Sequence, residues 1–292
     1  MLDLAQNTVE GLMIGSSYAL LALGFTLIFG VMRRLNLAYG ASIMLALYAA
    51  TFLHVQHGLG ALAVAAVAVV GAALVGAYVE RLCFAPMGPG ADIAAMVSSF
   101  AIWMQLEQAA VLLLPRHTYP FPTLAGGTAL EFGPFLVRPE HLLMLASASG
   151  LVLALHLALY RSRAGLALRA VIDSPVAAHL AGIPVRRIRF VAFALASAVG
   201  GVAGVLILAA DGQVTPMFGM WATLKGLVAM MIGGLGSLPG ALAGGLFLGV
   251  VEMQGQYFFG PQARDLIAFV LLFAVLVLRP GGILGCAGLR SR

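Results

Sequence analysis

Nine apolar stretches follow one another along the chain, and most are long enough to cross a lipid bilayer. A bilayer core about 30 Å thick needs roughly 20 apolar residues in a helix. Six stretches approach that length, and they lie near 11–31, 35–53, 58–79, 92–114, 140–159 and 189–210. Two shorter stretches follow near 222–234 and 239–253, and a last one lies near 265–279. The sequence therefore predicts an all-α, polytopic transmembrane helix bundle.

The composition agrees with a membrane protein and excludes other classes. Of the 292 residues, 62% are hydrophobic and only 9% are charged, and the mean hydropathy is +1.03. Soluble domains carry about 25% charged residues. The two cysteines are too few for a disulfide framework. These values exclude a cytosolic enzyme, a secreted disulfide scaffold and a disordered chain, and we expect one transmembrane domain over residues 1–292.

The basic residues predict the orientation, because cytoplasmic loops of membrane proteins retain Lys and Arg. With the N-terminus outside, three arginines (Arg116, Arg138 and Arg264) face the exterior. Twelve then face the cytoplasm: Arg33, Arg34, Arg81, Arg161, Arg163, Arg169, Arg186, Arg187, Arg189, Arg279, Arg290 and Arg292. We expect about nine hydrophobic elements, eight or nine of them spanning, with a cytoplasmic C-terminus. Residues 222–253 form either two spans or a re-entrant hairpin that enters and leaves from outside.

The loop 160–188 is longer than a connection between two helices requires, and it is rich in arginine. Its segments 164–172 and 176–181 have helical character. Asp or Ser suits a helix cap, Pro suits the first turn and Gly suits the C-cap. We therefore expect a short amphipathic helix that begins near Asp173 and ends at Gly182. Such a loop either anchors the protein on lipid headgroups or docks a cytoplasmic partner.

Motifs for ATP hydrolysis and for hydrolytic catalysis are absent from the sequence. The only lysine, Lys225, precedes Gly226, whereas a phosphate-binding loop needs Lys followed by Ser or Thr. The sequence has no His-Glu-x-x-His, no Cys-x-x-Cys and no Gly-x-Ser-x-Gly. We therefore expect no catalytic residue and no metal site in this chain, and transport is the function class that remains.

A glycine-rich segment lies between residues 200 and 249, with several glycines spaced four residues apart. Small residues at that spacing let helix backbones pack closely. Within the segment, GGLGSLPG (233–240) interrupts two half-length apolar pieces. Short pieces interrupted by Gly and Pro point to a translocation path, although an ordinary cytoplasmic turn has the same composition. The candidate path or gate residues here are Gly233, Gly234, Gly236, Ser237 and Gly240.

Four polar residues in or beside spans are further candidates for the path: Asn36, Tyr39, Glu107 and Lys225. Ionisable residues inside a span cost a few kcal/mol and are usually functional. Glu107 is the deepest acid. Lys225 lies early in a short helix and either reaches outward to water or serves the path. Asn36 is alternatively the cap of the second helix, and Glu252, near an external end, is expected at the membrane interface.

Several motifs, in order along the chain, resemble the permease subunits of bacterial branched-chain amino acid ABC importers (the Liv type, H-like subunit). They are GLMIGSSYALLALGFTLIFG (11–30), RLNLAYG (34–40), LRAV (168–171) through residues 182–183, GGLGS (233–237) through residues 244–245, and RPGGILG (279–285). The similarity runs from about residue 8 to residue 286. Each motif alone is weakly specific, whereas the ordered set is specific for the family.

The resemblance implies a subunit that pairs with a second, homologous permease in the bacterial inner membrane. Two cytoplasmic ATPase subunits, which bind the ATP and Mg, would drive the pair, and a periplasmic solute-binding protein would deliver the solute. The loop 160–188 would be the coupling loop. Its expected ATPase-coupling residues are Arg169, Asp173, Ala177, Ala178 and Gly182. Val176 stands where the family pattern has Glu, and Tyr39 stands where the family usually has His.

The expected mechanism is alternating access without chemistry in this subunit. The resemblance implies branched-chain or other hydrophobic amino acids as solutes, and relatives with the same layout are associated with urea, short-chain amides and aromatic acids. A stand-alone secondary transporter would need buried ion-coupling carboxylates, for which Glu107 is the best candidate. A passive channel would conduct without ATP.

Overall fold

Each apolar stretch becomes a helix in the structure, a computed structural model that describes residues 2–88, 90–114, 118–124, 130–132, 135–279 and 281–284. The corresponding helices are α1 (Leu2–Met32), α2 (Tyr39–His57), α3 (Ala61–Val79), α4 (Asp92–Leu113), α5 (Pro139–Arg161), α8 (Val185–Asp211), α9 (Phe218–Gly233), α10 (Leu238–Phe259) and α11 (Ala263–Leu278). A π-helical turn, η1 (Glu80–Phe84), extends α3. Two further helices, α6 (Arg163–Asp173) and α7 (Pro175–Leu180), lie between α5 and α8. The predicted all-α class is confirmed.

Five helical segments are long and apolar enough to cross a membrane: Asp3–Met32, Ala61–Phe84, Asp92–Leu113, Pro139–Arg161 and Val185–Asp211. The helices α9 and α10 are long and apolar enough to cross only when they are taken together. The pair is bent by 116°, and if it is one span the candidate spans number six. The helices α2 and α11 are present as predicted, but neither is among the segments that are long and apolar enough to cross a membrane. The described chain is therefore a polytopic membrane helix bundle.

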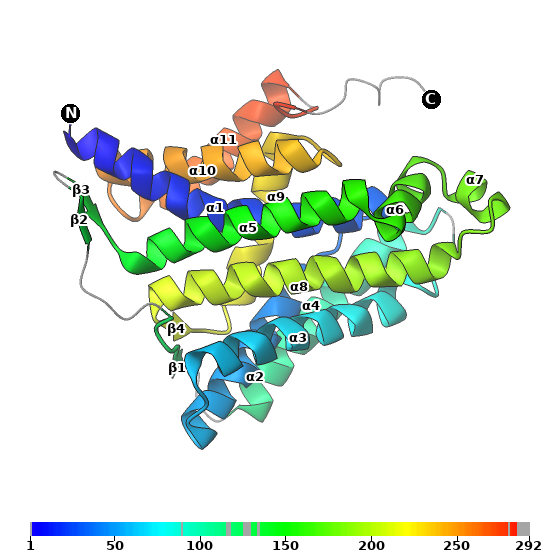
Figure 1. Cartoon of the computed structure of the whole chain (residues 1–292), viewed down its shortest axis with the longest axis horizontal. Coiled ribbons are helices and arrows are strands. Elements are labelled where there is room, and N and C mark those ends of the chain that lie inside the picture. Colours follow the sequence, from blue (N-terminus) through cyan, green and yellow to red (C-terminus); the bar gives the residue numbers. More distant parts are fainter. Residues whose placement is uncertain are drawn as a thin grey trace.

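The bundle has two distinct ends (Figure 1). The N-terminal end of α1 lies near the four short strands, whereas α6 and α7 lie at the opposite end of the long axis. Most of α1 and α8 is buried, whereas α3, α4 and α5 expose most of their surface. Because most exposed side chains of α3, α4 and α5 are apolar, these helices face either lipid or another protein. The core is thus built around α1 and α8.

Two small antiparallel ladders lie in and beside the loop 115–138, and the sequence analysis did not predict them. Strand β1 (Tyr119–Pro120) pairs with β4 (Gln213–Val214), and β2 (Leu130–Phe132) pairs with β3 (Phe135–Val137). Strands of two or three residues are too short to show a period-2 pattern. The buried Tyr119 ring lies 5.3 Å from Tyr48 and 6.0 Å from Phe52 of α2, measured between ring centroids, so β1 is fixed to α2.

Glycines bring α1 and α10 into close contact, as the four-residue spacing predicts. Gly245 and Gly249 of α10 lie against the α1 backbone at Ala19 and Gly15. A Cβ on Gly249 would collide with the backbone of Gly11 and Gly15. Because both contacts are with backbone atoms, the neighbours cannot move aside as a flexible side chain would. Van der Waals packing of this kind holds helices together where the solvent is lipid.

We expect Gly249→Ala to destabilise the protein by about 1–3 kcal/mol, because the added methyl group overpacks a fixed backbone contact. The matched control is Gly150→Ala in α5, where a Cβ meets nothing within 4 Å. Thermal unfolding of both purified variants in detergent tests the expectation. Equal melting temperatures for the two variants would show that the α1–α10 contact is not as tight as described.

Candidate functional site

Four charged side chains from three helices meet in the bundle, and two of them are almost fully buried. Lys225 of α9 and Glu252 of α10 have 4% and 1% of their side chains exposed, with Lys225 Nζ 2.6 Å from Glu252 Oε1. Asp265 Oδ1 of α11 lies 2.8 Å from the same Nζ atom. Arg264 Nε, also of α11, donates to Glu252 Oε2 at 3.1 Å. We call these four residues, together with Tyr18 of α1, the ion-pair cluster.

Two aromatic residues complete the surroundings of these charges. The Tyr18 hydroxyl donates to Glu252 Oε2 at 3.0 Å and accepts a hydrogen bond from Arg264 Nη2. Lys225 Nζ lies 5.9 Å from the ring centroids of both Tyr18 and Trp221, within the range of a cation–π contact. An ion taken out of water costs several kcal/mol unless it is paired. The cluster meets this requirement with two cations and two carboxylates.

The ion-pair cluster corrects two expectations from the sequence. Lys225 does not reach outward to water, because its ammonium group is buried against two carboxylates. Glu252 is buried rather than interfacial. Sequence reasoning missed Tyr18 and Arg264, which are 246 positions apart and share no motif. The available signal was that a lone lysine in an apolar helix requires a buried carboxylate partner.

A cavity of about 650 Å³, here called the cluster cavity, lies beside Tyr18, Trp221 and Arg264. Charged groups of both signs line it: Glu10, Arg138, Asp211 and Arg264, with the His141 imidazole beside them. Apolar side chains from five elements also line it: Ile14, Met144, Ile207, Leu208, Phe218 and Met253; uncharged polar side chains are present as well, namely Ser17, Gln213, Thr215 and Gln256. In the described part of the chain, no three His, Cys, Asp or Glu side chains are grouped so as to hold a metal ion.

The bend between α9 and α10 is built from the predicted glycine-rich residues. Gly233 at the end of α9 and Gly240 in the first turn of α10 lie so close that a Cβ on either would collide with the other's backbone. Gly234 has φ +114°, which L side chains rarely adopt. Ser237 caps α10, its Oγ accepting the Gly240 N–H at 3.1 Å. With Gly236 between them, these five residues form one helix–helix junction.

Residues near the end of the described chain close this junction. The Ile283 N–H donates to the Ile232 carbonyl at 2.8 Å, and the Leu284 N–H donates to the Gly233 carbonyl at 3.0 Å. The last carbonyl groups of a helix have no partner within the helix itself. Residues 281–284 belong to the closing motif noted in the sequence, and they lie against the end of α9. The junction therefore combines two segments about 45 residues apart.

The start of the predicted short helix is confirmed. The helical segments 164–172 and 176–181 correspond to α6 and α7, with Asp173 as the last residue of α6. Ser174 is the N-cap of α7 and its Oγ accepts the Ala177 N–H at 3.2 Å, while Pro175 occupies the first turn. The Ser174 side chain thus gives a hydrogen-bond partner to the Ala177 amide, which has none within the helix.

Gly182 ends this helical turn as predicted. It follows the C-cap Ala181 and has φ +78°, and its N–H donates to the His179 carbonyl at 3.0 Å. The next amide, that of Ile183, donates to the Ala178 carbonyl at 3.0 Å. These two hydrogen bonds form a Schellman cap, which needs a left-handed residue at this position.

The helix α7 presents an apolar surface away from the bundle. Val176 is 72% exposed and Leu180 is 84% exposed, and Ala177 is exposed beside them. Ala178 is buried and faces the bundle. Two large apolar side chains on a six-residue helix are unfavourable in water, and such patches are typical of protein contacts.

One cavity brings predicted coupling residues together with predicted gate residues. This cavity of about 460 Å³, here called the junction cavity, is lined by Arg169 and Asp173 of α6 and by Gly236 and Ser237. The end of α1 also lines it. The Arg169 guanidinium lies 4.8 Å from the centroid of the Tyr160 ring. The loop 160–188 and the glycine junction, some 60 residues apart in sequence, thus line one cavity.

Tyr39 and Asn36 are buried but lie away from these two cavities. Tyr39 is the first residue of α2, its hydroxyl donates to the Ala196 carbonyl at 3.2 Å, and its ring lies 4.5 Å from Phe25 between centroids. The Asn36 Oδ1 accepts the Ala38 N–H at 3.1 Å. Because α2 has no side-chain cap, the reading of Asn36 as its cap is wrong.

Glu107 is not brought together with the other predicted path residues. It lies on α4, half-buried, with the exposed Gln105 and Gln108 beside it. Within the described ranges, none of these three side chains forms a hydrogen bond or an ion pair. Among the described residues, three polar side chains therefore lie without partners on a largely apolar stretch of α4.

Comparison with known proteins gives a consistent result along the whole chain. The family model described as branched-chain amino acid transport system / permease component matches residues 7–276. The chain is 33% identical to the high-affinity branched-chain amino acid transport system permease protein BraD of Pseudomonas aeruginosa, over 96% of this chain and 95% of BraD. It is 30% identical to the corresponding protein LivH of Escherichia coli K12, with 96% and 95% covered.

A solved structure supports the fold. PsaBC from Streptococcus pneumoniae, in complex with Fab, matches with a TM-score of 0.50 and 12% identity over 91% of this chain and 90% of that chain. The family model and the relatives show that the chain is a multi-pass membrane protein and a transporter subunit, not a catalytic ATPase. Being a permease, it requires partner subunits of an ABC system. It belongs to the family of permease components of branched-chain amino acid transport systems.

Proposed function

We propose that this chain is the H-like permease subunit of an ATP-driven importer for branched-chain or other hydrophobic amino acids in the bacterial inner membrane. The observation that carries the proposal is the junction cavity, which Arg169 and Asp173 share with Gly236 and Ser237. The helix α6 packs against α1, and α1 packs against α9 and α10, so a movement of the loop between α5 and α8 reaches the bend between α9 and α10 through α1.

We propose an orientation with the N-terminus outside and the C-terminus in the cytoplasm, which needs an odd number of spans: nine if α9 and α10 both cross the membrane, and seven if they form a re-entrant hairpin. The placement of the N-terminal end of α1 and of α7 at opposite ends of the bundle supports it (Figure 1). The arginine distribution supports it as well. The 116° bend supports the re-entrant alternative for residues 222–253, with Gly233–Gly240 as its apex.

The mechanism proposed is alternating access. ATP, with Mg, is bound by two partner ATPase subunits, and their movement reaches this chain at α7. The exposed Val176 and Leu180 side chains and the Schellman cap at Gly182 support α7 as a firm contact element. The movement passes through α6 to the glycine junction. Because two packed states separated by a few kcal/mol suffice for switching, no chemical step is required in this subunit.

The proposed solute is a zwitterion with an apolar side chain, received in the cluster cavity. Carboxylates (Glu10, Asp211) suit an ammonium group, and cations (Arg138, Arg264) suit a carboxylate. The apolar wall around Phe218 suits an aliphatic side chain. Charges of both signs favour an amino acid over uncharged urea or short amides. A periplasmic binding protein would deliver the solute to this end of the bundle.

The proposed second permease covers α4. Gln105, Glu107 and Gln108 form no hydrogen bond or ion pair with any other described residue, and they lie on a largely apolar stretch of α4, where polar side chains that face lipid are unfavourable. Contact with a second, homologous subunit would give these side chains partners, because polar groups join helices in membranes. Glu107 would then act at a subunit contact rather than in a pore through this chain alone.

We expect amino acid uptake only from the complete assembly. Proteoliposomes that hold this chain, the second permease and both ATPases should accumulate leucine when the binding protein and ATP are supplied. Proteoliposomes with this chain alone should accumulate none, with or without an ion gradient. Ion-driven uptake by the single chain would instead establish a secondary transporter, and flux without ATP would establish a channel.

We expect Leu180→Asp to abolish co-purification with the ATPase subunits, because a charge would be buried in an apolar contact. Folding should be retained, since the side chain is 84% exposed in this chain. Leu180→Met, which keeps an apolar side chain, is the matched control and should bind the ATPase. Normal ATPase binding by Leu180→Asp would remove α7 from the coupling path.

We expect Lys225→Met to lower stability by about 3–5 kcal/mol and to abolish uptake, because the carboxylates around it lose a buried partner. The double variant Lys225→Met with Glu252→Gln should recover part of the stability by restoring neutrality. Glu107→Gln is the control, and its melting temperature should equal that of the parent, since this carboxylate has no partner in the described chain. A Lys225→Met protein as stable as the parent would contradict the ion-pair cluster.

A further inference from the structure

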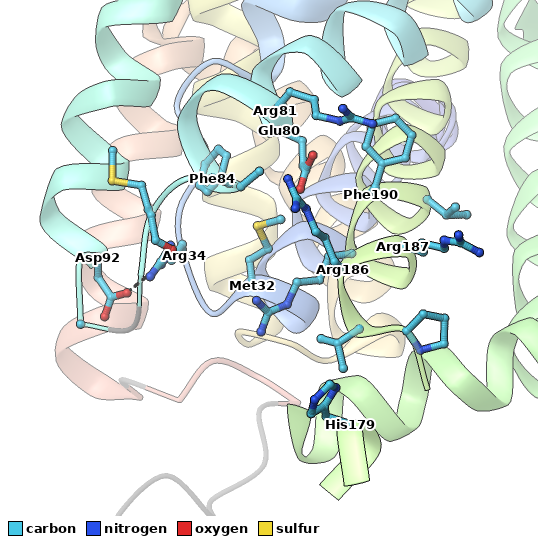
Figure 2. A pocket seen from close by; sticks show the side chains of 17 residues that line it. Met32, Arg34, Glu80, Arg81, Phe84, Asp92, His179, Arg186, Arg187 and Phe190 are labelled. Carbon is cyan, nitrogen blue, oxygen red and sulfur yellow. Dashed lines mark hydrogen bonds and ion pairs between the residues drawn. The ribbon is translucent and has the colours of Figure 1, made fainter. Parts of the chain in front are cut away.

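A cavity of about 1230 Å³ lies at the end of the bundle that carries α7, and arginines dominate its wall (Figure 2). Its walls come from the end of α1, from η1 and the segment that follows, and from the start of α8, with His179 of α7 at one edge. The charged lining residues are five arginines and two carboxylates: Arg34, Arg81, Arg186, Arg187, Arg189, Glu80 and Asp92. We call this space the arginine cavity.

Among the described residues, only one of the five arginines forms an ion pair with a carboxylate. Arg34 Nε lies 2.9 Å from Asp92 Oδ1, whereas the other four form no ion pair within 4 Å among the described residues. Glu80 is buried in the wall, where Arg81, Arg186 and Arg189 act on it electrostatically. The Arg189 Nε atom is buried without a hydrogen-bond partner. The cavity therefore holds a clear excess of positive charge that the chain itself does not neutralise.

The apolar part of the cavity wall continues onto helix surfaces that lie in the membrane. Figure 2 shows Arg81 reaching over Phe190, with its guanidinium 5.0 Å from the ring centroid. On α8, Arg187 is followed at four-residue spacing by the exposed Val191 and Leu195, which therefore lie on one helix face. A line of exposed apolar side chains thus leads from the cavity into the membrane.

The same order of residues recurs on the neighbouring helix. Arg81 is preceded at helical spacing by Tyr78 and Leu74 of α3, and both are exposed. On each helix, basic groups at the end of the membrane span adjoin apolar groups within it. This combination matches a phospholipid, which has an anionic phosphate above two hydrocarbon chains.

We propose that the arginine cavity binds the headgroup of an anionic phospholipid, with the acyl chains along the exposed faces of α3 and α8. Guanidinium groups pair well with phosphate oxygens, and basic pockets between helices on the cytoplasmic side are suited to anionic headgroups. An acidic segment of a cytoplasmic protein would satisfy the charges but would not use the apolar faces at Val191 and Tyr78. The site goes beyond the transport function and lies outside the proposed solute path.

The test measures lipid binding to the full chain in neutral detergent by native mass spectrometry, which is independent of uptake. We expect phosphatidylglycerol to bind about tenfold or more tightly than phosphatidylcholine. The variant Arg81→Gln with Arg186→Gln should lose this preference. Arg163→Gln, which removes an exposed arginine of α6 outside the cavity, is the matched control and should keep it. Replacing Arg81 and Arg186 by Lys should retain part of the preference for phosphatidylglycerol. Such a result would show that the loss in the double Gln variant comes from the missing charge and not from misfolding.

Three outcomes would overturn the proposal. The first is an unchanged preference for phosphatidylglycerol in the double Gln variant. The second is full displacement of the lipid by millimolar inorganic phosphate, which would indicate a site for a free anion. The third is unchanged lipid binding combined with lost ATPase co-purification in the double Gln variant, which would indicate an acidic protein segment.

Discussion

The buried contact between Lys225 and Glu252 determines how four helices are arranged at one end of the bundle. A charge in the low-dielectric interior is stable only when it is paired and hydrogen-bonded. Lys225 therefore ties α9 to α10, and Glu252 draws in α1 through Tyr18 and α11 through Arg264. Moving any one of these helices alone would break at least one of these contacts. The lining of the cluster cavity is held in place by the same contacts.

The packing of α10 against α1 and α9 also depends on close contact between helix backbones, which glycine allows. The helices α1 and α10 approach at Gly15 and Gly249, and α9 meets α10 at Gly233 and Gly240. These contacts let the short helix α9 and the full-length helix α10 form a bent pair inside the bundle. The bend leaves carbonyl groups at the end of α9 that need partners, and the amide of Ile283 supplies one of them.

Local patterns predicted the helices well and the side-chain contacts poorly. Apolar length located all nine main helices, and the Ser, Pro and Gly signals located α7 almost to the residue. The Lys225 environment was not predictable in this way, because Tyr18 and Arg264 come from opposite ends of the chain and carry no shared spacing. The two-residue strand at Tyr119 was missed for a related reason, since its partner strand is nearly a hundred residues away.

The arrangement of the ion-pair cluster also bears on how the proposed gate opens. Lys225 has two carboxylate partners, one buried on α10 and one exposed on α11, and Glu252 has two cationic partners. If α11 moves away from α10, the contact between Lys225 and Glu252 remains and neither ion is left alone. If α9 moves instead, Glu252 keeps its contacts with Arg264 and Tyr18. Lys225 then keeps a carboxylate partner as long as it stays in reach of the exposed Asp265. Shared partners therefore lower the electrostatic cost of movement, whereas a single isolated pair would have to break completely.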